Sequence, residues 1–196
     1  TVWAFAVFNL RPEVFFSARF VSLVESMVMD MKPESLAQLH QWQIWHHEHN
    51  KPFLLNAAVC DRLVLAFTSN PTKVSKLQRS VSRTLEILCH DVAEEVSLRL
   101  GYSLDALVSW RGHEVAVEVD GPSHFAHRKP RGATILKRRQ LRRVAHLNLL
   151  VIPYWEWDAL PHLQAKKEYL RKGLDAALVM EVEKPVLINA DNDVNR

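Results

Sequence analysis

Two short apolar segments joined by an Arg-Gly pair are the feature that most constrains the fold of this chain. Residues 102–110 and 114–119 each have the length of a strand and are rich in Val, Leu and aromatic side chains. The pair between them, Arg111-Gly112, suits a tight turn because glycine reaches positive φ without steric cost. The two segments are therefore expected to pair as antiparallel strands.

Helical patterns surround this strand pair. Apolar residues recur at helical spacing from Val74 to Leu100, just before Gly101, which suits a C-terminal cap. The later part of the chain is expected to form a basic helix, a third strand and a last helix over 134–146, 147–154 and 157–179. The order helix, strand, strand, helix, strand, helix predicts an α/β fold with a small mixed sheet flanked by helices.

The first part of the chain is expected to be all-α, with helices separated by prolines. Pro12, Pro33 and Pro52 each stand near an apolar segment with helical spacing, and proline suits the first turn of a helix. We interpret 1–71 as helical hairpins, either the end of an α-solenoid or a plain four-helix packing unit. The Ser-Asn-Pro sequence that ends this segment marks the expected boundary, followed by an α/β domain over 72–180 and a tail over 181–196.

Composition narrows the class of protein. The chain of 196 residues is 48% hydrophobic with only five glycines, which is typical of a globular protein with its own core. Cys60 and Cys89 are too few for a disulfide framework or a zinc cluster. The apolar run over 2–10 is too short to span a bilayer, which needs about 20 residues, so we expect no membrane partner. Because the first residue is Thr1, we interpret the sequence as a fragment or a processed chain.

Three carboxylates are expected to gather beside the strand pair. Glu118 and Asp120 lie on one face of their strand because successive side chains alternate, and Asp105 of the preceding strand is placed next to them. With Glu95 from the preceding helix and His124 from the following loop, they suit a Mg²⁺ site that could polarise a phosphodiester and activate water. The alternative is that they serve as caps, loop anchors and partners of nearby arginines.

The positive charge of the chain is concentrated in one segment. The net charge is only +3, yet no Asp or Glu occurs over 122–154. Eight cations fall within a short part of that segment, namely Arg128, Lys129, Arg131, Lys137, Arg138, Arg139, Arg142 and Arg143. On a helix they form a cationic ridge that can neutralise phosphates. The alternative is a solvated charged face, although such a face usually mixes both signs.

Aromatic and histidine side chains accompany the basic segment. Phe125, Tyr154, Trp155 and Trp157, together with His124, could stack on unpaired bases. We expect Tyr154 and Trp157 to pack inward instead, which leaves the role of Trp155 open. A second histidine group could hold a metal, but we expect an exposed helix end at His46, His47 and His49.

Four segments of the second half resemble the RAP domain, which is named for its abundance in apicomplexans. They occur in the order and spacing of the family, and read GYSLD at 101–105, VEVDGPSHF at 117–125, TILKRR at 134–139 and VIPYWEW at 151–157. The resemblance implies a restriction-endonuclease-like fold with helical repeats ahead of it. It also implies a role with RNA in mitochondria or chloroplasts.

The same resemblance implies a nuclease pattern from which this chain departs. The related endonuclease folds carry an Asp on one strand and Glu-x-Lys on the next. Asp105 and Glu118 match, whereas Asp120 stands in the place of the lysine, and Lys137 of the basic helix is the candidate substitute. If the chain is catalytic, these four residues are the expected catalytic set, with the three carboxylates as Mg²⁺ ligands. Otherwise no cofactor is required.

Three functions stay open at this point. The favoured one is an organellar RNA-binding protein, mitochondrial with the chloroplast as alternative, that acts in RNA processing or as a mitochondrial ribosome component. Its expected RNA contacts are the eight cations and His124. The second is a Mg²⁺-dependent endoribonuclease. The third is a scaffold that binds ribosomal or other organellar proteins through the helical half.

Overall fold

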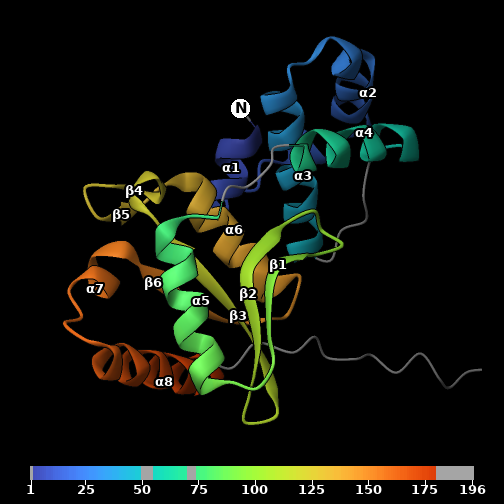
Figure 1. Ribbon diagram of the computed structural model, residues 1–196. Coiled ribbons are helices and arrows are strands. Elements are labelled where there is room, and N and C mark those ends of the chain that lie inside the picture. The colour runs from blue at the N-terminus through green and yellow to red at the C-terminus, as the bar shows by residue number, and fades with distance from the viewer. Residues whose placement is uncertain (1, 50–54, 70–73, 180–196) are drawn as a thin grey trace, which may run out of the picture.

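The computed structural model describes residues 2–49, 55–69 and 74–179. Figure 1 shows the N-terminal helices at one end of the molecule and a twisted sheet with its covering helices at the other. The chain is mixed α/β, with an all-helical segment ahead of a four-stranded sheet, which confirms the predicted fold class. The expected boundary at 71–72 and the expected tail over 181–196 lie outside the described residues.

The described part of the N-terminal segment holds four α-helices: α1 (Val2–Phe8), α2 (Ala18–Met27), α3 (Pro33–Glu48) and α4 (Ala57–Thr68). Helix α3 packs against both α1 and α4, and its Trp42 and Trp45 are fully buried. Pro33 is the first residue of α3, as expected, because its missing N–H is not needed there. Helix α4 begins after Asn56, whose side chain caps it. Pro52, which was expected to open this helix, lies outside the described residues.

A four-stranded sheet frames the second half. Its strands are β1 (Val92–Ser97), β2 (Ser103–Trp110), β3 (His113–Asp120) and β6 (Asn148–Pro153), in the spatial order β1-β2-β3-β6. Strands β2 and β3 pair antiparallel across the predicted turn, where Arg111 and Gly112 have φ angles of 50° and 81°. Strand β6 pairs with β3 in parallel, so the sheet is mixed.

Strand β1 corrects the prediction of one helix from Val74 to Leu100. Helix α5 (Lys76–Leu88) ends earlier, and the chain continues as β1, antiparallel to β2. Val92 and Val96 fit both patterns, because residues four apart share one face of a helix and also one face of a strand. Pairing with β2 decides between them, since it provides partners for the backbone N–H and C=O groups.

Helices cover both faces of the sheet (Figure 1). Helices α5 and α8 (Leu163–Val179) pack on the face that carries Val115, Val117 and Val119 of β3. Helix α6 (Gly132–Arg143) packs on the other face, where Leu141 joins Ala116 in a second apolar cluster. The strand alternation of apolar side chains therefore gives the domain two cores, one on each side of the sheet.

The chain around α6 is more divided than predicted. Ahead of α6, the segment expected as a loop contains a short hairpin of β4 (Phe125–Ala126) and β5 (Lys129–Pro130). After β6, the single helix expected over 157–179 is two helices, α7 (Tyr154–Asp158) and α8. Pro161 between them explains the break, because proline lacks the N–H that a continuous helix needs.

Helix α6 belongs to both halves of the molecule. Its Leu136 is part of the apolar core of the N-terminal helices, while Leu141 is part of the core under the sheet. Gln140 is fully buried between them, where it donates to the carbonyl of Gln41 over 2.8 Å and accepts from the hydroxyl of Tyr102 over 2.6 Å. The helical segment and the sheet therefore share α6, and they also meet directly, because Ile44 of α3 lies in the same cluster as Leu104 and Ala116.

In the part of the chain that the structure describes, no helix has the length and apolar character needed to cross a membrane. Cys60 and Cys89 are both free thiols. Burial raises the pKa of the Cys89 thiol, which disfavours the reactive thiolate and suits a small core side chain.

Candidate nucleic-acid interface

Two cations of α6 face the sheet and pair with carboxylates of β3. Lys137 Nζ donates to Glu118 Oε2 over 2.6 Å and to the carbonyl of Ser103 over 2.8 Å. Arg138 donates to Asp120, two residues further along β3. The side chains of Glu118 and Asp120 are only 4% and 3% exposed. Such deeply placed carboxylates need a cationic partner, because a lone buried charge costs several kcal/mol.

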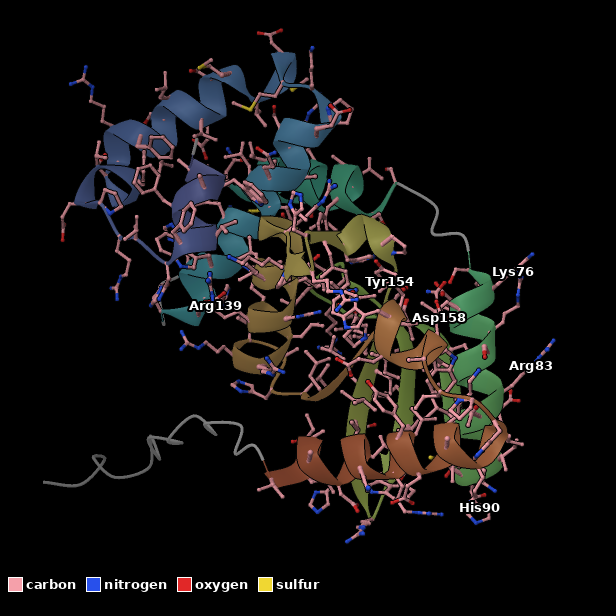
Figure 2. The ribbon with its side chains drawn as sticks, turned by 90° about the vertical axis from the view of Figure 1, so that its left-hand side faces the viewer. Lys76, Arg83, His90, Arg139, Tyr154 and Asp158 are labelled. Carbon is pink, nitrogen blue, oxygen red and sulfur yellow. The ribbon has the colours of Figure 1, made fainter. Side chains whose placement is uncertain are left out.

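Arg139 points away from the sheet, toward the N-terminal helices (Figure 2). Its Nε donates to Glu48 Oε2 over 2.8 Å, and its terminal nitrogens donate to the carbonyls of Val7 and Ala6. The Glu48 side chain is fully buried. Burial raises the pKa of Glu48, and the guanidinium of Arg139 opposes that shift. Arg139 thus holds α6 against α1 and α3.

These ion pairs differ from the outward cationic ridge that the sequence suggested. The segment around α6 contains no acidic residue, so its own sequence offers no partner for Lys137, Arg138 or Arg139. The partners come instead from β3 and from α3, which are distant in sequence. Three of the eight basic charges are therefore neutralised inside the molecule and fix the position of α6.

The other five basic residues form no ion pair with any described residue, and we call them the basic track: Arg128, Lys129, Arg131, Arg142 and Arg143. The first three are exposed and lie at the β4–β5 hairpin, just ahead of α6. The last two lie at the C-terminal end of α6, one half-buried and one exposed. The track therefore places free positive charge at both ends of this helix.

An aromatic side chain adjoins the basic track. The ring of Trp155 is half-buried and packs edge-to-face on Phe125, with centroids 4.4 Å apart. The Cζ of Arg128 lies 5.6 Å from the Trp155 ring centroid. Trp157 is only 1% exposed, which confirms its predicted inward packing, whereas Tyr154 is half-buried. Trp155 is thus a partly accessible aromatic side chain next to the free cations.

The expected carboxylates do gather at β2 and β3, but most of their oxygens are already bonded. Asp105 accepts from the backbone N–H of Val119 over 2.6 Å and from the side-chain amide of Gln78. Glu118 accepts from Lys137, while its other oxygen, Oε1, has no hydrogen-bond partner among the described residues. Burial raises the pKa of Glu118 to about 7. The ammonium of Lys137 opposes this shift, and the charge of Asp105 adds to it.

Asp120 ends β3 with both oxygens engaged. Its Oδ1 lies 3.0 Å from His124 Nδ1, and its Oδ2 accepts from Arg138. Burial alone would raise the pKa of Asp120, but the hydrogen bonds and charges of His124 and Arg138 outweigh it and lower the pKa. The bond to Asp120 in turn raises the pKa of His124. His124 therefore anchors the loop after β3 to the end of the strand.

These bonds bear on the expected magnesium site. Among the residues that the structure describes, no group of three or more His, Cys, Asp or Glu side chains has the arrangement of a metal site. Mg²⁺ in proteins is held by one or two carboxylates and several waters. In the trio of Asp105, Glu118 and Asp120, only Glu118 Oε1 has no bond to a described residue. A magnesium ion bound here would have to share or displace these hydrogen bonds, and the site stays a prediction.

Two further residues were expected at the predicted site, Lys137 and Glu95. Lys137, the candidate substitute for the strand lysine, does reach Glu118 from α6. Glu95 lies on β1 rather than on a helix, across from Asp105, with a φ of 51°. Burial raises the pKa of Asp105, and the charge of Glu95 adds to that shift.

The histidine group of α3 is not the exposed helix end that was expected. His46 is 1% exposed, and its ring packs edge-to-face on Trp42 at a centroid distance of 4.5 Å. Only His47 of the three is exposed, while His49 is half-buried. The prediction was wrong because α3 lies in the centre of its segment, between α1, α4 and α6, so that nearly its whole last half is buried.

Sequence reasoning missed two partners in this region, Glu48 and Gln78. Nothing local to Glu48 indicates its bond to α6. For Gln78 a signal exists, because Ser75 and Gln78 form a capping box that marks the start of α5. A helix beginning there, next to β2, brings Gln78 to Asp105.

Comparison with known proteins agrees with the RAP resemblance of the sequence. The family model of the RAP domain matches residues 117–172, from within β3 to within α8. The chain is also similar to a chloroplastic RAP domain-containing protein of Oryza sativa subsp. japonica, with 35% identity over 111 residues. The alignment covers 55% of this chain but 17% of the rice protein, so the chain spans only a small part of that relative's length. The RAP match suggests RNA binding.

Proposed function

We propose that this chain binds RNA through the basic track, because residues 117–172 match the family model of the RAP domain. The observation that supports the proposal is that the cations of the basic segment fall into two groups, one bonded inside the molecule and one not. Three of its cations are bonded to internal carboxylates, whereas the five of the track keep their charge available. Cations that neutralise phosphates release counterions, and this term supplies affinity that does not depend on base sequence.

Trp155 supports single-stranded RNA as the ligand. Phe125 fixes the ring from one side, and Arg128 lies near it. A base stacked on such a ring contributes about 1–3 kcal/mol, and unpaired bases are the ones whose faces are accessible. A strand that follows the basic track would therefore meet an aromatic surface at the β4–β5 end.

Reversing two exposed charges of the track tests the proposal. Binding of a short labelled oligouridylate to the full chain is measured by fluorescence anisotropy for the wild type and for Arg128→Glu with Arg131→Glu. We expect the double variant to bind about tenfold more weakly at low salt, and the slope of log K against log salt to fall by about 1.4 because two phosphate contacts are lost. Arg138 and Arg139 are unsuitable for this test, since their ion pairs hold the fold.

The matched control reverses two exposed arginines outside the track, Arg19→Glu with Arg99→Glu, and is called the control variant below. It makes the same change in net charge. The proposal requires the control variant to bind RNA almost like the wild type. If both double variants weaken binding to the same degree, net charge alone governs the interaction and the track is not the interface.

We further propose that the chain acts in an organelle. The rice relative is chloroplastic by name, which supports an organellar location and the chloroplast as the alternative. A mitochondrial location and a part in RNA processing or in a mitochondrial ribosome stay predictions, as do protein contacts through the helical half. Imaging of the full-length protein in its own cells, followed by sequencing of crosslinked RNA, would separate ribosomal RNA from transcripts.

One observation favours an endoribonuclease as a second candidate. Lys137 Nζ lies 2.6 Å from Glu118, and Asp105 is close enough to influence the pKa of that carboxyl, so an Asp, a Glu and a Lys share one site. The test is cleavage of a labelled RNA with and without Mg²⁺ by the wild type and by the isosteric Glu118→Gln. Cleavage that is equal in both proteins, or absent from both, removes this candidate.

A further inference from the structure

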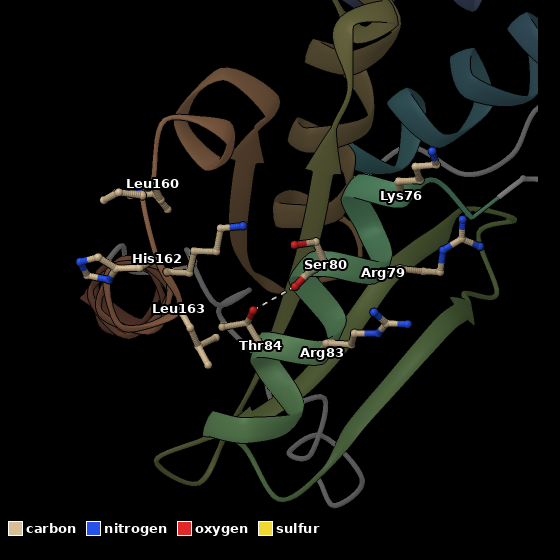
Figure 3. Close-up of a pocket in the computed structure, with 10 residues that line it drawn as sticks. Lys76, Arg79, Ser80, Arg83, Thr84, Leu160, His162 and Leu163 are labelled. Carbon is tan, nitrogen blue, oxygen red and sulfur yellow. Dashed lines mark hydrogen bonds between the residues drawn. The ribbon is translucent and has the colours of Figure 1, made fainter.

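A cleft of about 420 Å³ opens between α5 and the start of α8, on the face of the sheet opposite to α6 (Figure 3). Ser80 and Thr84 of α5 turn toward α8 in this view and form one wall. Leu160 and Leu163 line the other wall, and Leu163 is 51% exposed. The cleft is therefore large enough for part of a ligand and offers both hydroxyl and apolar contacts.

Four cations line this cleft, and none of them pairs with a carboxylate of the described residues: Lys76, Arg79, Arg83 and Lys166. The first three are spaced by three and four residues, so they form one stripe about 10 Å long on the outer side of α5 (Figure 3). No Asp or Glu is among the lining residues. The exposed Glu86 continues this face of α5 beyond the cleft, but the lining itself has one sign, and such a lining favours an anionic ligand.

The neutral groups of the cleft are also arranged as donors. The first residues of α5 and α8, Lys76 and Leu163, both line the cleft, so the partial positive charges of two helix N-termini lie at its edges. His162 accepts the N–H of Ala165 through Nδ1 over 3.1 Å, which leaves its Nε2–H as a donor.

Ser80 and Lys166 are placed by the same buried ring. Ser80 Oγ accepts the indole N–H of Trp157 over 3.1 Å and keeps its own proton to donate. Lys166 Nζ lies 4.9 Å from the centroid of the Trp157 ring. Trp157 is only 1% exposed, so it holds both donors from below while a ligand in the cleft would alter its surroundings.

We infer that this cleft is a second phosphate-binding site, and that it takes phosphates of an RNA strand that crosses α5. A lining of cations and donors that includes no acidic residue selects a ligand rich in acceptor oxygens. The stripe is longer than a single phosphate group, which favours a chain of phosphodiesters, and Leu163 offers an apolar contact for a ribose or a base. The assignment to RNA rests on the proposed function, whereas the phosphate site itself does not.

The first arm of the test measures RNA binding. The full chain with Arg79→Glu and Arg83→Glu is titrated with the labelled oligouridylate between about 50 and 200 mM salt, next to the wild type and the control variant. We expect about tenfold weaker binding at low salt and a salt slope smaller by about 1.4 for the cleft variant only. If the reversed charges prevent folding, Arg79→Gln with Arg83→Gln replaces them, because glutamine keeps the helix propensity.

The second arm separates RNA from a free nucleotide. The indole N–H resonance of Trp157 is followed while oligouridylate, and separately UTP, is added. A shift of the resonance with the oligonucleotide that is lost in the cleft variant supports the RNA assignment. A shift with UTP alone supports a phosphate-binding site but overturns the assignment to RNA. If neither ligand moves the resonance and the cleft variant binds RNA like the wild type, the inference is wrong. If the wild type binds no RNA at all, the proposed function fails, and the UTP titration still decides the cleft.

Discussion

At the scale of single residues, Arg139 is expected to be the most costly cation of α6 to remove. Arg139→Ala leaves Glu48 fully buried without its partner, and breaking a buried pair in this way costs about 3–5 kcal/mol. Urea unfolding of the variant should show this loss in the free energy of unfolding. The control is Lys129→Ala, an exposed cation without a charge contact to Glu48, for which we expect a change below about 0.5 kcal/mol. Similar losses for both would show that the Glu48 contact does not stabilise the fold.

His40 is expected to make stability depend on pH. Its Nε2–H donates to the carbonyl of Leu100 over 2.8 Å, and burial lowers the pKa of His40 below 6.5 in spite of that bond. Below pH 6.5 the unfolded chain therefore binds a proton that the folded chain does not, and the free energy of unfolding falls as the pH falls. His40→Gln should flatten this decline in urea titrations from about pH 7.5 to 5. The exposed His90→Gln is the control, and a slope unchanged by His40→Gln would contradict the prediction.

At the scale of elements, local sequence patterns predicted those helices and strands whose formation depends mainly on residues near one another in the chain. The β2–β3 hairpin follows from its turn, and α6 and β6 follow from their periodicity. Strand β1 was missed because Val92 and Val96 satisfy helical and strand spacing alike, and only pairing with β2 selects the strand. The partners of α6 were missed for a related reason. The charge pattern along the sequence holds no information on partners that are distant in the chain. The carboxylates bonded to Lys137, Arg138 and Arg139 come from β3 and α3.

The β2–β3 turn requires a positive φ at Gly112, and adding a single Cβ atom there tests this requirement. Gly112 has a φ of 81°, and apart from its two chain neighbours no residue has an atom within 4 Å of the position of an added Cβ. Gly112→Ala should therefore lower the free energy of unfolding by about 1–2 kcal/mol through backbone strain alone. Gly121→Ala is the matched control, because its surroundings are equally open and its φ of −72° suits any residue. Equal stability of the two variants in urea titrations would show that the turn tolerates a side chain.

At the scale of the whole molecule, α6 should make the helical segment and the sheet unfold together. Leu136 and Gln140 of α6 are buried against the N-terminal helices, while Leu141 is buried under the sheet. A core substitution remote from the sheet tests this coupling. Leu63→Ala in α4, where the side chain is fully buried, should cost about 2–5 kcal/mol through lost contacts and a cavity. If the molecule is one cooperative unit, hydrogen exchange in urea should show the same drop in midpoint for amides of α3 and of β3. A normal midpoint for β3 beside a lowered one for α3 would mean that the sheet folds independently of the helices that contact α6.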